Sequence, residues 1–283
     1  MEVYRTKHEI SDRIKALKTQ NKRIGFVATM GALHNGHLAL VKSALLDNDI
    51  VAVSVFVNPT QFNNQEDLDK YPRTLGRDID LLKTVSDDKI FVFAPTVDSI
   101  YNGHTVTEHF DFDGLEFEME GKFRQGHFDG VGTIVKKLLE IIQPDKAYFG
   151  EKDFQQLQII KKLVEKHKIP SEVIGCVIHR ETSGLAMSSR NERLKENYKK
   201  IAPFIYKTLK AAKQKFGTKS VNKVTEWVVS EFAKNELLEL EYFIIADEYT
   251  LKPVIRKSNK KTYRAFIAVY ADDIRLIDNI ALN

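Results

Sequence analysis

The sequence has few of the features that mark secreted and membrane proteins. Its one cysteine, Cys176, excludes an internal disulfide and a zinc site made of several cysteines. The apolar run 173–178 around it predicts a core strand with a buried structural thiol. No stretch approaches the roughly 18 apolar residues of a membrane-spanning helix, and the charged N-terminus has no apolar signal core. We therefore expect a protein of the reducing cytoplasm with no membrane as a partner.

The net charge of +4 is spread unevenly along the 283 residues. Residues 1–180 carry a net charge of −2, and residues 181–283 carry one of +6. This shift predicts two domains and a C-terminal part that attracts an anionic ligand, either a nucleic acid or a polyphosphate. The basic residues of that part lack interleaved aromatic residues or a motif that reads nucleic acid, so most of them are expected to form a solvated face.

The order of apolar runs and helical patterns predicts an α/β fold. In residues 1–180, short continuous apolar runs alternate with helical patterns, as in βαβ units of a parallel sheet covered on both faces. The expected strands are 24–29, 50–57, 90–93, 146–149 and 172–178, and the expected helices are 8–19, 37–46, 74–85, 128–142 and 153–168. The C-terminal part has helical patterns at 195–215 and 219–235, then strand-like runs at 240–246, 263–270 and 274–280. We predict a Rossmann-like, doubly wound parallel sheet in domain 1–180 and a smaller α+β lid domain, 181–283.

The segment His34-Asn35-Gly36-His37 joins the first expected strand to a helix. Unpaired backbone N–H groups and the positive end of the helix dipole favour anions at such a point. Gly36 lets a phosphate approach the backbone, and the two imidazoles can donate hydrogen bonds to charge that develops on it. A His-x-Gly-His sequence should arise by chance in roughly one shuffled chain per hundred of this composition. Two surface histidines in a turn are the alternative interpretation.

Other polar residues follow the expected strands or the domain boundary, where ligands of a parallel sheet bind. Lys152 offers a flexible cation for phosphate, and Asp153 can cap a helix or accept hydrogen bonds from ribose; an ordinary capped turn is the alternative. Ser188, Ser189 and Arg190 combine two hydroxyls with a planar guanidinium, which suits phosphate oxygens, or they begin the next helix.

Two glutamines and a histidine are candidates for binding an organic acid. Gln61 and Gln156 each carry amide donors and an acceptor that can contact a hydroxyl and a carboxylate together, although a lone glutamine in a loop is usually just solvated. His127, in a glycine-rich segment that opens a helix, is a candidate for orienting a substrate carboxylate.

Together these segments resemble the pantothenate synthetase (pantoate–β-alanine ligase) family of HxGH nucleotidyltransferases, over nearly the whole chain. The stretches that carry the resemblance are 29–37, 56–62, 71–74, 126–131, 149–156, 184–191 and 276–279. The resemblance implies that ATP adenylates pantoate with release of pyrophosphate, and that β-alanine then displaces AMP. It also implies that catalysis consists of positioning and charge stabilisation by His34, His37 and Lys152, with His37 as a proton donor.

The resemblance also implies which residues bind each substrate. The residues placed at ATP are Met30, Gly31, Ala32, Leu33, His34, Asn35, Gly36, His37, Gly150, Glu151, Lys152, Asp153, His179 (by its backbone), Met187, Ser188, Ser189 and Arg190. Gln61 and Gln156 are placed at pantoate, with Gln61 also beside β-alanine. Mg²⁺ is expected to arrive with ATP and to be held mainly by the phosphates, without a metal site of the protein's own. A homodimer is implied as well.

Two other functions stay open on the sequence alone. A related transferase that moves a nucleotide onto a phosphorylated alcohol would share His34, His37 and the two serines but would not need Gln61 and Gln156. A basic RNA-binding module would account for the charge of the C-terminal part, and its binding would weaken steeply with salt.

Overall fold

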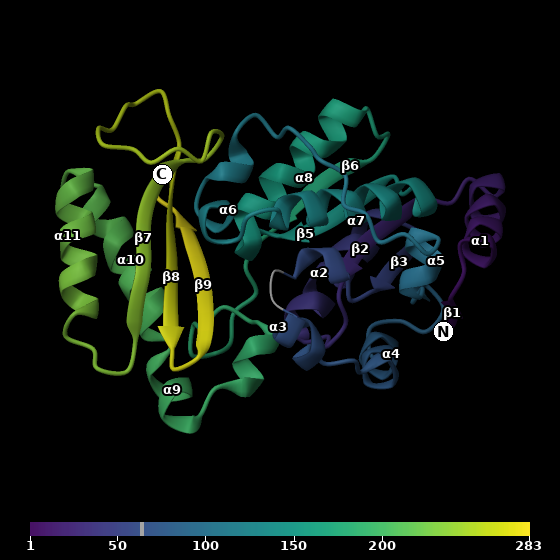
Figure 1. Cartoon of the computed structure of the whole chain (residues 1–283), viewed down its shortest axis with the longest axis horizontal. Coiled ribbons are helices and arrows are strands. Elements are labelled where there is room, and N and C mark those ends of the chain that lie inside the picture. Colours follow the sequence, from purple (N-terminus) through teal and green to yellow (C-terminus); the bar gives the residue numbers. More distant parts are fainter. Residues whose placement is uncertain (63–64) are drawn as a thin grey trace. The chain divides into compact units, whose positions relative to one another are not determined.

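The computed structural model describes residues 1–62 and 65–283, which form two compact units (Figure 1). The N-terminal unit comprises Met1–Glu151 and Gln155–Val177, and the C-terminal unit comprises Ile178–Asn283 together with the short segment Lys152–Phe154. Each unit has its own sheet and its own core.

The N-terminal unit is built on a six-stranded, entirely parallel sheet with the order β1-β4-β3-β2-β5-β6. The strands are β1 (Glu2–Tyr4), β2 (Ile24–Thr29), β3 (Ile50–Val55), β4 (Ile90–Phe93), β5 (Lys146–Gly150) and β6 (Glu172–Cys176). The predicted doubly wound sheet is confirmed, and its apolar central strands are almost completely buried. Strand β1 was not predicted, because three residues are too few to show a pattern. Cys176 ends the edge strand β6 and is only half-buried, so the prediction of a fully buried thiol in a core strand was wrong.

Helices connect these strands and cover both faces of the sheet, as Figure 1 shows. They are α1 (Lys7–Thr19), α2 (Asn35–Asp47), α3 (Gln65–Lys70), α4 (Leu75–Lys83), α5 (Val97–Tyr101), α6 (Glu120–Phe123), α7 (His127–Ile142) and α8 (Phe154–His167). Short 3₁₀ helices lie at η1 (Pro59–Gln61), η2 (Leu115–Phe117) and η3 (Glu151–Asp153). Local signals fix several helix starts: Thr6 and Glu9, for example, form a capping box at the start of α1.

The C-terminal unit is an antiparallel sheet with two long helices packed on one face. Its strands are β7 (Glu239–Asp247), β8 (Tyr263–Ala271) and β9 (Ile274–Ala281), and its helices are η4 (Ser189–Arg193), α9 (Glu196–Ile201), α10 (Phe204–Phe216) and α11 (Val221–Phe232). The predicted α+β character is confirmed. The helix predicted over 195–215 is two helices, because Pro203 lacks the N–H that a continuous helix would use. Among the helices of residues 1–62 and 65–283, none combines the length and the apolar character that a membrane span needs.

Candidate active site

The connectivity of the parallel sheet marks one position as the expected ligand site. From β2 the chain winds outward through β3 to β4, whereas β5 and β6 lie on the other side of β2. Ligands of doubly wound sheets bind at the carboxyl ends of the strands where the winding reverses. That position is the end of the β2–β5 pair, where β2 finishes at Thr29 and β5 at Gly150. The His34–His37 segment follows the first of these strands, and residues 151–153 follow the second.

His34 and His37 are held at the start of α2 by hydrogen bonds to the backbone. The backbone N–H of Gly36 donates to Nδ1 of His34 at 3.1 Å, and the N–H of His34 donates to Nδ1 of His37 at 3.2 Å. The two rings lie 4.0 Å apart between centroids. Because each Nδ1 accepts a hydrogen bond, each neutral imidazole carries its proton on Nε2. The helix start therefore carries two Nε2–H groups at the positive end of the α2 dipole, which favours anions.

A buried carboxylate, absent from the predicted site, shapes the loop that precedes His34. Asp78 of α4 is completely buried and accepts hydrogen bonds from the backbone N–H groups of Ala32 at 3.1 Å and Leu33 at 2.8 Å. Ala32 adopts a left-handed conformation, with φ of +51°, that side chains other than glycine seldom take. Asp78 thus stabilises an unusual turn between β2 and α2. A charged residue one turn before Leu82, on the buried face of its helix, was the available signal.

Gln61 ends η1, and the start of α7 fixes its backbone. The carbonyl oxygen of Gln61 accepts from Nη2 of Arg124 at 3.2 Å and from Nδ1 of His127 at 3.0 Å. Nη1 of Arg124 lies 3.1 Å from Nε2 of His127. A guanidinium can only donate, so Nε2 of His127 accepts and its Nδ1–H donates to Gln61. His127 is buried and both its ring nitrogens contact the protein, so the prediction that it orients a substrate carboxylate is replaced by a role in positioning Gln61.

The turn before Gln61 is fixed by a buried amide and by close packing on α7. Asn58 is completely buried; its Nδ2 donates to the carbonyl oxygen of Gly130 at 3.2 Å, and its Oδ1 accepts from the hydroxyl of Tyr101 at 2.6 Å. Burial raises the pKa of Tyr101 above its ordinary value, which keeps this donor protonated. A Cβ atom on Gly130 would lie 2.1 Å from the carbonyl oxygen of Thr60. Only glycine therefore allows α7 to approach η1 this closely.

The two adjacent glutamines at the start of α8 differ in their surroundings. Gln155 is buried; its Nε2 donates to the carbonyl oxygens of Leu115 and Glu118, and its Oε1 accepts from the N–H of Glu120. Its amide is fully engaged in holding the 115–120 segment. Gln156, the residue predicted to bind substrate, is half-buried on the same helix.

The segment that follows β5 carries the predicted lysine. Gly150 has open space where a Cβ atom would be, so the backbone there is accessible to a ligand. Lys152 and Asp153 belong to the C-terminal unit, and Nζ of Lys152 lies 3.6 Å from Oδ1 of Asp153. Lys152 is the more buried of the two, with 19% of its side chain exposed against 49% for Asp153.

The remaining predicted residues of the C-terminal unit lie together on one tight loop. The N–H of Met187 donates to the carbonyl oxygen of His179 at 3.0 Å. Ser188 caps η4, its Oγ accepting from the N–H of Arg190 at 3.3 Å, and Ser189 begins that helix. These residues begin a helix, as the alternative interpretation expected, but it is the short 3₁₀ helix η4 and not the predicted helix 195–215, whose first part, α9, starts at Glu196. The loop places hydroxyl and guanidinium donors beside one another.

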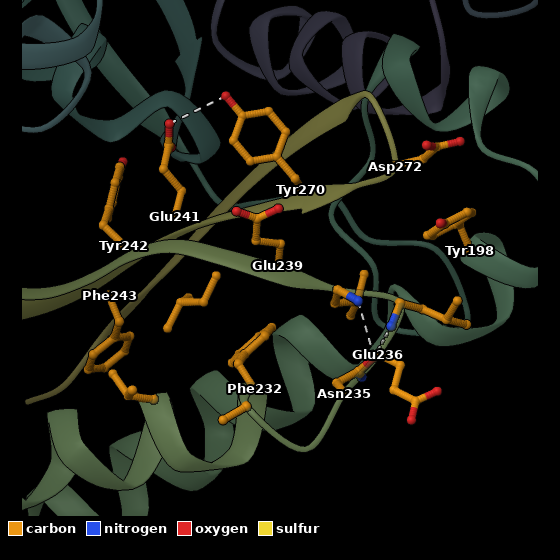
Figure 2. Close-up of a pocket in the computed structure, with 15 residues that line it drawn as sticks. Tyr198, Phe232, Asn235, Glu236, Glu239, Glu241, Tyr242, Phe243, Tyr270 and Asp272 are labelled. Atoms are coloured by element: carbon orange, nitrogen blue, oxygen red, sulfur yellow. Dashed lines mark hydrogen bonds between the residues drawn. The ribbon is translucent and has the colours of Figure 1, made fainter.

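A groove elsewhere in the C-terminal unit has a different chemistry (Figure 2). It has a volume of about 720 Å³ and lies along β7 and the end of α11. Acidic and tyrosine side chains line much of it, among them Glu239, Glu241, Tyr242 and Tyr270. Its lining residues include none of the predicted site residues, so the groove is separate from the candidate active site.

Comparison with known proteins connects these features to one family. The family model described as pantoate-beta-alanine ligase matches residues 2–281. The pantothenate synthetase of Christiangramia forsetii is 58% identical over 283 residues, which is 100% of both chains. The crystal structure of pantothenate synthetase from Thermus thermophilus has a TM-score of 0.91 at 37% identity and covers 100% of this chain and 99% of its own. The pantoate-beta-alanine ligase of Francisella tularensis, complexed with beta-gamma ATP and beta-alanine, has a TM-score of 0.80 at 36% identity, with 100% and 98% covered.

Proposed function

Because the chain belongs to the pantoate–beta-alanine ligase family, we propose that it joins pantoate to β-alanine at the expense of ATP. A carboxylate oxygen of pantoate bonds to the α-phosphorus of ATP, and pyrophosphate leaves with the electrons of the broken P–O bond. The amine of β-alanine then bonds to the acyl carbon of pantoyl adenylate, AMP leaves, and the amine loses a proton. The observation that carries the proposal is the match over residues 2–281, together with the paired histidines at the end of β2.

We propose that His34 and His37 act on the phosphates through their Nε2–H groups. During attack on the α-phosphorus, negative charge grows on the phosphate oxygens and on the leaving pyrophosphate. Donors fixed by backbone hydrogen bonds can stabilise that charge without reorganising. Lys152 would add a full positive charge on a phosphate, and His37 would act as the proton donor.

The remaining contacts with ATP are proposed from the same resemblance. The loop Met30–Leu33, shaped by Asp78, and Asn35 and Gly36 would line the nucleotide, as would Gly150, Glu151 and Asp153. In the C-terminal unit we propose a backbone contact from His179 and phosphate contacts from Met187, Ser188, Ser189 and Arg190. Mg²⁺ would enter with ATP, coordinated mainly by phosphate oxygens.

We propose that Gln61 and Gln156 bind pantoate, which offers a carboxylate and hydroxyl groups. A primary amide donates through nitrogen and accepts through oxygen, so one side chain can satisfy both groups. The fixed backbone of Gln61 supports this role, because positioning a reactant costs less when its binding group is already ordered.

The full-length match favours this ligase over both alternatives raised by the sequence, nucleotide transfer to a phosphorylated alcohol and RNA binding. We further propose a homodimer in the cytoplasm with small-molecule substrates and no nucleic-acid or membrane partner.

The test is formation of pantothenate from pantoate, β-alanine and Mg-ATP by the purified protein. We expect stoichiometric AMP and pyrophosphate, and no product when any one substrate is omitted. Release of ADP instead of AMP, or no product with all three present, would contradict the proposal.

A further inference from the structure

The segment that carries Lys152 is attached to the C-terminal unit at two points. Nδ2 of Asn279, on β9, donates to the carbonyl oxygen of Lys152 at 3.0 Å. Two residues further on, the ring of Phe154 packs under the guanidinium of Arg264, 3.9 Å from its centre, and against Phe266 at 5.9 Å between centroids. These contacts explain why Lys152–Phe154 groups with the C-terminal unit although it continues directly from β5.

The orientation of the Asn279 amide is fixed by its neighbour. Nη1 of Arg264 donates to Oδ1 of Asn279 at 2.7 Å. Since a guanidinium cannot accept a hydrogen bond, Oδ1 must face Arg264, and the donor Nδ2 is left to face Lys152. Arg264 is itself held by Oε1 of Glu248 at 2.9 Å, and both Arg264 and Asn279 are buried.

The residue before Asn279 anchors the loop that carries the paired serines. The carboxylate of Asp278 accepts two hydrogen bonds from the guanidinium of Arg180, at 2.7 and 2.9 Å, in a bidentate pair. That guanidinium stacks 3.5 Å from the ring centre of Tyr206. Oδ1 of Asp278 also accepts the backbone N–H of Asn279 at 2.8 Å. Arg180 pairs with Ala186 at the base of the loop that leads to Ser188.

We propose that Asn279 is a positioning residue for Lys152, and that Asp278 and Asn279 of β9 keep Lys152 and the Ser188–Arg190 loop in one fixed arrangement. Asn279 does this through the backbone carbonyl, so the lysine side chain stays available to a phosphate. The inference rests on the proposed function only in assigning Lys152 to ATP. The hydrogen bond from Asn279 to the carbonyl of Lys152 joins two residues of the C-terminal unit and does not depend on that function.

Substitutions at Asn279 test the inference by activity. We expect Asn279→Ala to slow pantoate-dependent exchange of pyrophosphate into ATP about tenfold at saturating pantoate, with an unchanged KM for pantoate. Asn279→Asp should be at least as slow although its side chain has nearly the same volume, because a carboxylate oxygen cannot donate to the carbonyl of Lys152. The control is Tyr263→Phe on β8 of the same sheet, which removes hydrogen bonds to the backbone of Ser258 in the preceding loop and should leave the exchange rate of the folded enzyme within twofold.

A double-mutant cycle separates positioning from general stability. If Asn279 acts through Lys152, then Asn279→Ala should add less than a twofold loss to Lys152→Ala. The inference would be overturned if the fold losses in exchange rate of the two single variants multiplied in the double variant. It would also be overturned if the unfolded fraction of Asn279→Ala accounted for its whole loss of rate. If Lys152→Ala retained the full rate, the phosphate role of Lys152 would be wrong.

Hydrogen exchange tests the attachment without any activity. The amides of residues 152–155 should exchange at least fivefold faster in Asn279→Ala than in wild type, and at the wild-type rate in Tyr263→Phe. Unchanged exchange in Asn279→Ala would refute the attachment, even if the protein proved to be a ligase.

Discussion

Replacing Gly130 with alanine should misplace Gln61 without touching any atom of its side chain. Gly130 lies in the first turn of α7, where a Cβ atom would meet the carbonyl oxygen of Thr60 at 2.1 Å, its carbonyl carbon at 2.7 Å and the backbone nitrogen of Gln61 at 3.1 Å. All three are backbone atoms, so no side-chain rotation relieves the clash.

The required displacement follows from these distances. Moving the contact from 2.1 Å to an ordinary 3.4 Å separates α7 from η1 by about 1.3 Å. That movement also strains the hydrogen bonds from Asn58 to Gly130 and from His127 to Gln61. Overpacking of this kind costs about 1–3 kcal/mol of stability. A misplacement of about 1 Å in a positioning group costs about a hundredfold in rate.

The assay is pantoate-dependent pyrophosphate exchange as a function of pantoate concentration, with thermal unfolding measured in parallel. Two glycine controls isolate the cause. In Gly76→Ala, on α4, the new methyl group meets nothing within 4 Å, so it should stabilise the protein by about 0.5–1 kcal/mol and leave the exchange rate unchanged. Gly132→Ala, on α7 itself, crowds the ring of Phe110 at 2.9 Å, so it should destabilise the protein without a comparable loss of pantoate binding.

The account of Gln61 would be refuted by a stable, fully active Gly130→Ala variant. Alanine favours a helix over glycine by about 1 kcal/mol, so a protein without this close approach would gain stability from the change. Equal loss of pantoate response in Gly130→Ala and Gly132→Ala would also contradict it, since only the first residue contacts η1.

Further predictions concern the site and its supports. His37→Ala should slow adenylate formation by about a hundredfold or more while the protein still folds, with a lower unfolding midpoint because the N–H of His34 loses its acceptor; near-normal turnover would contradict its role. Gln61→Ala should chiefly raise the KM for pantoate, and an unchanged pantoate response would remove it from the site. Asp78→Ala should destabilise the protein by roughly 2–4 kcal/mol, measured by urea unfolding, because the buried N–H of Leu33 and the partly buried N–H of Ala32 lose their acceptor. A hydrogen bond to Asp129 raises the pKa of His109 above 6.5, so its stabilising contribution is present below the unfolded-state pKa and is lost as the pH rises through the higher folded-state pKa. NMR titration should place the His109 midpoint above 6.5 in wild type and lower in Asp129→Asn.

The parts of the fold that local patterns specify were predictable from the sequence. Strand 24–29 and the helix that follows it were recognisable because a continuous apolar run and helical spacing are both visible in a window of about a dozen residues. The three-residue strand β1 gave no such pattern, since it is defined by pairing with β4, almost ninety residues away. The break at Pro203 had a local signal, which the helical spacing on either side obscured.

The candidate site was predictable where residue type alone indicates chemistry, as with the paired histidines. Its supporting residues were not, because they act across long stretches of chain. Asp78 holds a loop 46 residues earlier in the sequence, and Asn279 holds a carbonyl 127 residues earlier. His127 was attributed to the substrate because a buried, fully paired imidazole and a ligand-binding imidazole look alike in a sequence. Only their hydrogen-bond partners distinguish them.

The central claim, that this chain activates pantoate as an adenylate at the end of β2, is tested most directly by isotope exchange between pyrophosphate and ATP without β-alanine. The account predicts exchange that requires pantoate, occurs in wild type and falls by about a hundredfold or more in His37→Ala. Exchange that proceeds equally without pantoate, or that is absent when both pantoate and Mg-ATP are supplied, would contradict it.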